Sequence, residues 1–283
     1  MQIVIASGKG GTGKTTVTSN LGYVLSQTRT ITLADCDVEE PNLGIFFPCI
    51  PKTHPVHVII PAVNESKCTY CGACSEFCRF GALTVLKDRV LFFPQLCHSC
   101  GGCFRVCSYD ALEKTPAYVG EILTCHVSDS LTLVSGKLKE GDVRTTAVIR
   151  RVREMTRNDP LVLLDSPPGT ACSFIETVDD VSLCVLVTEP TPFGLHDLSV
   201  AVNVLDVLNI PAAVVINRSE GSDEPIEEYC TGRGLPVLMK IPLDFPLLKA
   251  QNNSDIISRI DPAWFHRFKE LGEKILAYAG GFS

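Results

Sequence analysis

The chain has 283 residues, of which 45% are hydrophobic and 20% charged, with 21 Gly and 18 Pro. This composition excludes disordered, collagen-like and coiled-coil proteins, and at roughly 150 residues per domain the length predicts one large domain or one with a small companion. Twenty-five Lys and Arg against 32 Asp and Glu give a formal net charge of −7, which argues against a general nucleic-acid binder. We therefore expect small molecules or proteins, and no nucleic acid, as partners.

The apolar runs and helical stretches alternate along the chain in a βαβ pattern. A short β-type run at 3–6 precedes a Gly-rich loop, a helix from 14 to about 27 and a strand at 30–34. The pattern resumes after residue 117. The elements expected there are a helix from about 144, strands at 161–164 and 182–187, a helix at 195–208 and a strand at 212–216. Because these strands are apolar throughout, they are typical of a doubly wound α/β fold whose mostly parallel sheet is covered on both faces.

Fourteen cysteines are too many for an average cytosolic enzyme and too widely spread for a small disulfide scaffold, so metal binding is the first hypothesis. The apolar run at 1–7 is shorter than the hydrophobic region of a signal peptide, and no stretch approaches about 18 apolar residues. We expect a cytoplasmic protein without stable membrane insertion, in which reducing conditions keep thiols free for metal.

Between about Pro61 and Pro116 the βαβ pattern gives way to short, Cys-rich segments. This stretch is interpreted as an insertion that divides the chain into residues 1–60, 61–116 and 117–283. It contains an internal repeat at an offset of 29, in which a C-x2-C-x2-C-x3-C run that begins at Cys68 recurs from Cys97. A unit of this size buries little apolar surface and usually needs stabilising cross-links such as disulfides or bound metal.

Two such runs are typical of a small α+β bacterial-type ferredoxin, because three cysteines of each run bind one [4Fe-4S] cluster and the fourth binds the neighbouring cluster. Zinc is the alternative, although structural zinc sites use separated pairs rather than runs of four. Arg79 and Ser108 replace the proline that usually follows each fourth cysteine, which we expect to affect the reduction potential rather than ligation. The crossed pattern assigns Cys68, Cys71, Cys74 and Cys107 to one cluster, and Cys97, Cys100, Cys103 and Cys78 to the other.

A phosphate-binding loop is predicted between the first strand and helix, where residues 8–15 read GKGGTGKT and fit G-x-x-x-x-G-K-[ST]. In such a loop glycines let backbone N–H groups surround phosphates, Lys14 adds positive charge, and the Thr15 hydroxyl can bind Mg²⁺. The residues expected to bind nucleotide here are Gly8, Gly10, Gly11, Thr12, Gly13, Lys14, Thr15 and Thr16.

With Lys9 included, the loop resembles the deviant P-loop of the MinD, ParA, Mrp and nitrogenase iron-protein group of ATPases. The resemblance implies ATP hydrolysis in a homodimer that forms on ATP binding, or in a heterodimer with a paralogue, and a Lys9 that reaches a phosphate across the dimer interface. It also implies that Asp37 orients the attacking water. Lys9, Lys14 and Asp37 are therefore the expected catalytic residues.

Polar residues at other strand ends match the same group. Asp165 closes an apolar strand in the Walker B pattern and is the carboxylate expected beside Mg²⁺, with Asp35 expected to help hold the ion through water. Asn217 matches the adenine-reading asparagine, and Pro242 is expected to form a further wall of the base pocket. A helix cap for Asp165 and a turn residue for Asn217 are the alternatives.

The combination of this loop with a ferredoxin inserted after Asp37 resembles MinD-superfamily ATPases that contain a ferredoxin domain. The resemblance implies an ATP-driven switch coupled to electron transfer with a protein redox partner, and ATP, Mg²⁺ and two [4Fe-4S] clusters as cofactors. One alternative is an Mrp-type iron-sulfur carrier that delivers clusters to an acceptor protein. The other is a positioning ATPase of the MinD and ParA kind.

The remaining cysteines lack ligand spacing. Cys172 stands where the nitrogenase iron protein has an interface cluster ligand, but without a second cysteine a buried structural thiol is favoured. Packing roles are also expected for Cys36, Cys49, Cys125, Cys184 and Cys230.

Apolar residues from Trp264 to Tyr278 recur at 4-3-4-3 spacing, which predicts a helix that docks on the core rather than on a membrane.

Overall fold

The computed structural model describes residues 1–221 and 223–281, which form a nine-stranded sheet and a small satellite unit. The strand order is β11-β10-β9-β1-β8-β2-β7-β6-β3, and neighbours are parallel from β11 to β7 and antiparallel from β7 to β3. The predicted mostly parallel α/β sheet is therefore confirmed. The parallel strands are β1 (Gln2–Ala6), β2 (Ile31–Asp35), β7 (Leu131–Leu138), β8 (Val162–Asp165), β9 (Leu183–Thr188), β10 (Ala212–Ser219) and β11 (Val237–Pro242).

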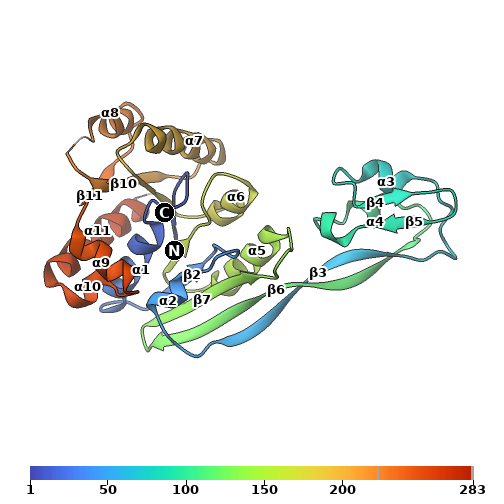
Figure 1. Ribbon diagram of the computed structural model, residues 1–283, viewed down its shortest axis with the longest axis horizontal. Coiled ribbons are helices and arrows are strands. Elements are labelled where there is room, and N and C mark those ends of the chain that lie inside the picture. The colour runs from blue at the N-terminus through green and yellow to red at the C-terminus, as the bar shows by residue number, and fades with distance from the viewer. Residues whose placement is uncertain (222, 282–283) are drawn as a thin grey trace.

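Helices cover both faces of this sheet (Figure 1). Alternate side chains of one strand enter opposite cores, so that Ile3 and Ile5 of β1 face one core and Val4 faces the other. The first core is closed by α1 (Lys14–Ser26), α2 (Leu43–Phe46), α9 (Phe245–Asn252), α10 (Ile257–Ile260) and α11 (Pro262–Gly280). The second is closed by α5 (Thr145–Thr156), α6 (Cys172–Val178), α7 (Pro192–Leu208) and α8 (Glu224–Gly232).

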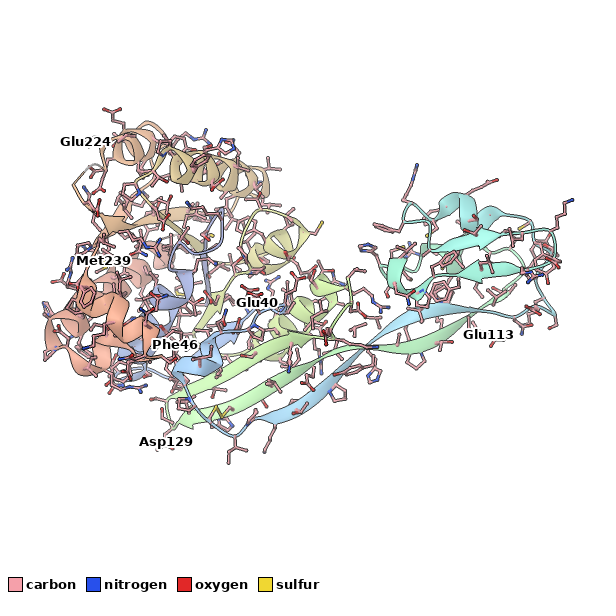
Figure 2. All side chains as sticks on the ribbon, in the orientation of Figure 1. Glu40, Phe46, Glu113, Asp129, Glu224 and Met239 are labelled. Carbon is pink, nitrogen blue, oxygen red and sulfur yellow. A yellow bond between two sulfur atoms is a disulfide. The ribbon has the colours of Figure 1, made fainter. Side chains whose placement is uncertain are left out.

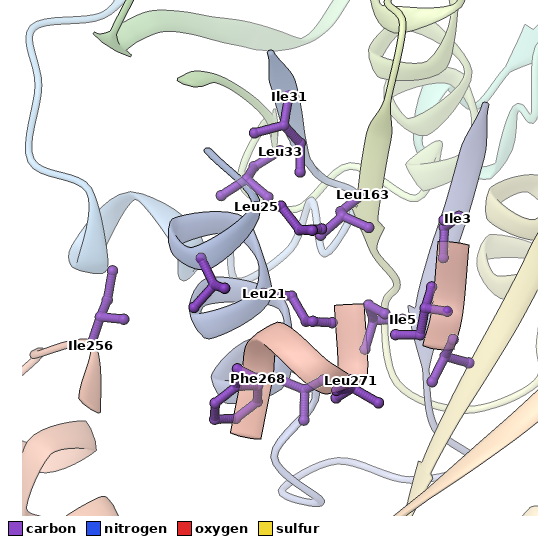
Figure 3. Packing of buried hydrophobic residues seen from close by; sticks show 14 of the residues in the cluster. Ile3, Ile5, Leu21, Leu25, Ile31, Leu33, Leu163, Ile256, Phe268 and Leu271 are labelled. Atoms are coloured by element: carbon purple, nitrogen blue, oxygen red, sulfur yellow. The ribbon is translucent and has the colours of Figure 1, made fainter. Parts of the chain in front are cut away.

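The stripe predicted on the last helix packs into the first core, where Figure 3 places Phe268 and Leu271 beside Leu21 of α1. Trp264 and Ile275 of the same stripe are also buried. Docking of α11 on the core is therefore confirmed. Across residues 1–221 and 223–281, no helix has both the length and the apolar character needed to cross a membrane.

An antiparallel ribbon of β3 (Lys52–Val63) and β6 (Leu112–Ser128) extends from the edge of the sheet (Figure 1). Figure 2 shows Asp129 at the sheet end of β6 and Glu113 at its far end, beside the satellite unit. The predicted insertion boundaries at 61 and 116 fall inside these two strands, since each strand continues from the sheet into the ribbon. The satellite unit contains α3 (Ala73–Phe77), an antiparallel pair of β4 (Leu83–Val85) and β5 (Val90–Phe92), η1 (Pro94–Leu96) and α4 (Gly102–Val106).

The ribbon leaves the sheet at a β-bulge in β6. Val56 pairs with Gly120 and His57 pairs with Tyr118, so Val119 is the extra residue. Pairing of β6 with β7 begins at Gly120. A Cβ there would lie 2.4 Å from the carbonyl oxygen of Lys137, so only glycine allows this close approach.

Two expectations for the isolated cysteines are wrong, although Cys36, Cys184 and Cys230 are buried as predicted. Cys49 and Cys125 form a disulfide rather than separate packing thiols, because the segment after α2 runs back to β6 and brings their Cα atoms to 6.3 Å. Cys172 is exposed rather than buried, because it is the first residue of α6, at the end of the loop that follows β8.

Candidate functional site

The phosphate-binding loop between β1 and α1 depends on two glycines in left-handed conformations, Gly11 (φ +79°) and Gly13 (φ +94°). The Asn217 amide at the end of β10 donates a hydrogen bond to the carbonyl oxygen of Thr12 at 2.7 Å. The residue that was predicted to read the base therefore braces the loop, and its role toward the base stays a prediction. Pro242 lies alongside, because it pairs with Ser219, two residues beyond Asn217.

The Asp165 carboxylate is held by two hydroxyl groups of α1. Thr15 Oγ1 donates to Asp165 Oδ2 at 2.7 Å, and Thr18 Oγ1 donates to Oδ1 at 2.8 Å. Burial raises the pKa of Asp165, while the positive charge of Lys14 and the two hydroxyl hydrogen bonds oppose that rise. Sequence reasoning missed Thr18, although its position one turn after Thr15 on the same helix face could have indicated it.

Two further carboxylates follow β2 and differ in role. Asp35 is fully buried and accepts hydrogen bonds from the backbone N–H groups of Leu43 (3.0 Å) and Asp37 (3.1 Å), so it organises the loop after β2. Burial and then the charge of Asp165 raise the pKa of Asp35 well above its ordinary value. Burial raises the pKa of Asp37 to about 6, and Lys14 opposes this rise. Asp37 is partly exposed, whereas Asp35 and Asp165 are buried.

Lys9 points to a partner that the sequence did not predict. Its Nζ lies 3.0 Å from Oε2 of Glu189, which follows β9. The two residues are 180 positions apart, and no spacing in the sequence indicates the pair. The lysine expected to act across a dimer interface is therefore paired within its own chain in this structure.

The residues around the loop fit a phosphate group with Mg²⁺. The hydroxyl oxygens of Thr12 and Thr16 are buried without a hydrogen-bond partner among the described residues. Both hydroxyl groups can therefore donate hydrogen bonds to phosphate oxygens. Lys14 is buried beside them, and Asp165 with Thr15 offers the hard oxygen ligands that Mg²⁺ prefers.

The predicted cysteine sets line two separate cavities in the satellite unit. One cavity is lined by Cys68, Cys71, Cys74 and Cys107, and the other by Cys78, Cys97, Cys100 and Cys103. Among the residues described, no three His, Cys, Asp or Glu side chains converge closely enough for a single metal ion. A [4Fe-4S] cluster offers a separate iron to each of its four ligands, so it requires no such convergence.

The two halves of the satellite unit repeat the same backbone geometry at the same offset of 29. The left-handed residues of the first half are Tyr70, Gly72 and Gly81, and those of the second half are Ser99, Gly101 and Asp110. Backbone N–H groups also point at sulfur, because Ser99 donates to Cys97 Sγ at 3.4 Å and Ala111 donates to Cys107 Sγ at 3.3 Å. Such contacts stabilise thiolates and tune clusters that thiolates bind.

Comparisons with known proteins agree with the architecture. The chain matches the CobQ/CobB/MinD/ParA nucleotide binding domain over residues 3–257. It is 31% identical over 227 residues to the uncharacterized protein MJ0579 of Methanocaldococcus jannaschii, covering 79% of this chain and 82% of that protein. It is also 24% identical over 302 residues to an iron-sulfur cluster carrier protein of the same organism, covering 99% and 85%.

Solved structures share the fold. The cell division ATPase MinD of Pyrococcus furiosus aligns with a TM-score of 0.60 and 20% identity over 98% of each chain. MinD of Pyrococcus horikoshii complexed with Mg-ADP aligns with a TM-score of 0.60 and 18% identity over 100% of this chain and 98% of that one. With its fold, its phosphate-binding loop and the match over residues 3–257, the chain belongs to the CobQ/CobB/MinD/ParA family of nucleotide-binding domains.

Proposed function

We propose that the protein is an ATP-hydrolysing, dimeric switch whose nucleotide state is coupled to electron transfer through a two-cluster ferredoxin unit. The observation that carries the proposal is the crossed lining of the two cavities, each with three cysteines of one run and the fourth of the other. The same chain contains the nucleotide-binding loop. The partner would be a redox protein that docks on the satellite unit.

In the ATPase half, the loop and Lys14 would bind the phosphates, and Thr15 with Asp165 would hold Mg²⁺, which neutralises charge on the phosphates when bound. Catalysis of this kind depends on positioning and electrostatics rather than on covalent chemistry. With a pKa of about 6, Asp37 is mostly ionised at neutral pH and can accept a hydrogen bond from the attacking water. The family match and the Mg-ADP complex of a fold relative support this assignment.

A second copy of the chain, or a paralogue, would dock on the face that carries the loop. Phe193 at the start of α7 and Phe245 at the start of α9 are each 77% exposed. Both follow the carboxyl ends of parallel strands, as the phosphate-binding loop does, and large exposed apolar residues at one edge favour a protein contact. Lys9 would then reach the nucleotide of the opposite protomer.

In the satellite unit, the eight cysteines would bind two [4Fe-4S] clusters, which accept and donate single electrons when bound. Helices α3 and α4 hold the two runs together at a close contact, because a Cβ at Gly102 would lie 1.9 Å from the Phe77 ring. This packing keeps the cavities adjacent. The backbone N–H groups of Ser99 and Ala111 would stabilise the reduced state.

The backbone connects the two halves. Val38, directly after Asp37, accepts a hydrogen bond from Leu138 at 2.7 Å, and the next residue of that segment, Lys139, donates to the bulged Val119 at 2.9 Å. Movement of the segment around Asp37 would therefore act on the base of the ribbon. Through this route hydrolysis would reposition the clusters against a docked partner.

Potentiometric titration of the anaerobic protein with and without ATP tests the proposal. Coupling of about 1 to 3 kcal/mol would shift a one-electron potential by roughly 40 to 130 mV. A Lys14→Gln variant with full iron content is the matched control, since it should bind clusters but show no ATP-dependent shift. Equal potentials in the wild type, together with ATPase rates that are independent of redox state, would contradict the coupling.

The second candidate is an iron-sulfur carrier, favoured by the relative of that name that covers 99% of this chain. In that case the satellite clusters are cargo or a relay, and incubation with an apo-acceptor protein should transfer iron and sulfide to it. Transfer that ATP accelerates, without any shift in potential, would favour this function over electron transfer.

A further inference from the structure

Glu189 joins two cations beside the phosphate-binding loop. Oε2 lies 3.0 Å from Lys9 Nζ, and Oε1 accepts a hydrogen bond from Arg218 Nη1. The Glu189 side chain is only 11% exposed, whereas those of Lys9 and Arg218 are 33% and 45% exposed. The carboxylate is therefore the fixed member of the cluster, and both cations reach it from more open positions.

The backbone that carries Glu189 is held rigidly between β9 and α7. Thr188 Oγ1 donates to the carbonyl oxygen of Gly194 at 3.0 Å, and Thr191 accepts from the Gly194 N–H at 3.0 Å as the helix N-cap. A Cβ at Gly194 would lie 2.2 Å from the Glu189 carbonyl oxygen. Glu189 consequently keeps its backbone position if Lys9 moves.

Arg218 makes the release of Lys9 feasible. A buried carboxylate that loses its partner is strongly destabilising, because its charge is then uncompensated. Here Arg218, which directly follows the loop-bracing Asn217, stays on the other oxygen and compensates the charge. A phosphate offers Lys9 more negative charge than one carboxylate shared with an arginine.

We propose that Glu189 is a positioning residue that sequesters Lys9 in the nucleotide-free protomer, and that ATP-dependent dimerisation exchanges Glu189 for a phosphate oxygen on the Lys9 ammonium. The exchange is ionic and transfers no proton or electron. It sets the ATP concentration at which the dimer forms. The inference rests on the proposed ATP-dependent dimer with Lys9 acting across its interface.

Sedimentation velocity of the full-length protein, titrated with a non-hydrolysable ATP analogue and Mg²⁺, tests the exchange. Glu189→Gln should lower the analogue concentration for half-maximal dimerisation about three- to tenfold, because the neutral amide binds Lys9 less strongly. Arg218→Gln should raise it, because Glu189 then pairs with Lys9 alone. Glu227→Gln is the matched control, since Glu227 pairs with Lys240 instead and its loss should change nothing.

A double-mutant cycle separates pairing of Glu189 with Lys9 from a general electrostatic effect of the Glu189 charge on dimerisation. In a Lys9→Gln background, Glu189→Gln should no longer alter the dimerisation midpoint, because no lysine remains to be released. An effect that persists in that background overturns the proposal, as does an unchanged or raised midpoint for Glu189→Gln in the wild-type background.

Amine labelling of Lys9 in the absence of nucleotide, followed by mass spectrometry, tests sequestration without reference to dimerisation. Glu189→Gln should increase the labelling rate several-fold, and an unchanged rate overturns the inference even where the dimer forms. A wild-type protein that stays monomeric with the ATP analogue would instead contradict the proposed dimer, and the exchange with it. Circular dichroism and thermal unfolding establish that each variant is folded.

Discussion

The Asn217 amide occupies the space that a side chain at Gly13 would need, since a Cβ there would lie 2.3 Å from Asn217 Nδ2. Gly13 is thus required twice, once for its left-handed backbone and once for this contact. We expect Gly13→Ala to reduce nucleotide affinity more than tenfold, because the loop must shift away from β10. Titration with a fluorescent ATP analogue measures the loss.

Gly11→Ala is the matched control for this prediction. Gly11 is also left-handed, at φ +79°, but apart from its chain neighbours no atom of the described residues lies within 4 Å of its ideal Cβ. It should therefore show only the conformational cost of about 1 to 2 kcal/mol. Equal losses for the two variants would indicate that the contact with Asn217 is unimportant.

The raised pKa of Asp37 predicts a pH-dependent stability. The pKa rises from 3.8 to about 6, mainly through burial, so between these pH values the folded protein binds more protons than the unfolded protein. Stability consequently falls as pH rises through this window. Asp37→Asn should stabilise the nucleotide-free protein, by an amount that grows from about pH 4 to 6 and stays constant above.

Denaturant unfolding across this pH range measures the stability difference between Asp37→Asn and wild type. The same variant should abolish ATP hydrolysis, and the wild-type rate should decline below about pH 6 as Asp37 becomes protonated. A stability difference that does not vary with pH would show that Asp37 titrates elsewhere.

The Thr18 hydroxyl should matter for Mg²⁺ although it is not expected to touch the ion. Thr18→Val removes the hydrogen bond to Asp165 Oδ1 but preserves side-chain volume. A hydrogen bond to a charged group contributes about 1.5 to 3 kcal/mol, so the Mg²⁺ concentration for half-maximal hydrolysis should rise about tenfold or more. An unchanged Mg²⁺ dependence would mean that Thr15 alone orients Asp165.

The crossed ligand sets can be tested with two pairs of substitutions. Cys78→Ser with Cys103→Ser removes two ligands from one cavity, and the iron content should fall from about eight to about four per chain. Cys78→Ser with Cys74→Ser removes one ligand from each cavity, and should abolish both clusters. An uncrossed arrangement gives the reverse result. Iron and sulfide analysis after anaerobic reconstitution distinguishes the two.

The sequence predicted β1, α1 and β2 to within a residue or so, because each combines a strong apolar pattern with a clear stop. It did not predict β3, in which Pro55 and Pro61 are typical strand breakers. The structure accommodates both because β3 is an edge strand of the sheet and, among the described strands, pairs only with β6. Proline has no backbone N–H to donate, and an edge strand tolerates this because its outer side pairs with no other strand.

The candidate site was predictable where its chemistry is local. The loop of residues 8–15 and each of the two cysteine runs can be recognised because all the residues of the motif lie within a short stretch of the sequence. The Lys9–Glu189 ion pair and the Cys49–Cys125 disulfide do not, since each joins residues that only the three-dimensional fold brings together. Exposure of Cys172 likewise depends on how the loop after β8 enters α6.

The bulge at Val119 lies where the ribbon leaves the sheet, so a rotation there would be amplified along the length of the ribbon. Beyond the bulge β3 continues over residues 57–63, about 23 Å at 3.3 Å per residue. A rotation of about 10° at the bulge would displace the far end of the ribbon by about 4 Å. This displacement exceeds the length of a hydrogen bond, which is about 3 Å. A rotation of this size would thus be large enough to make or break hydrogen bonds between the satellite unit and a protein docked on it.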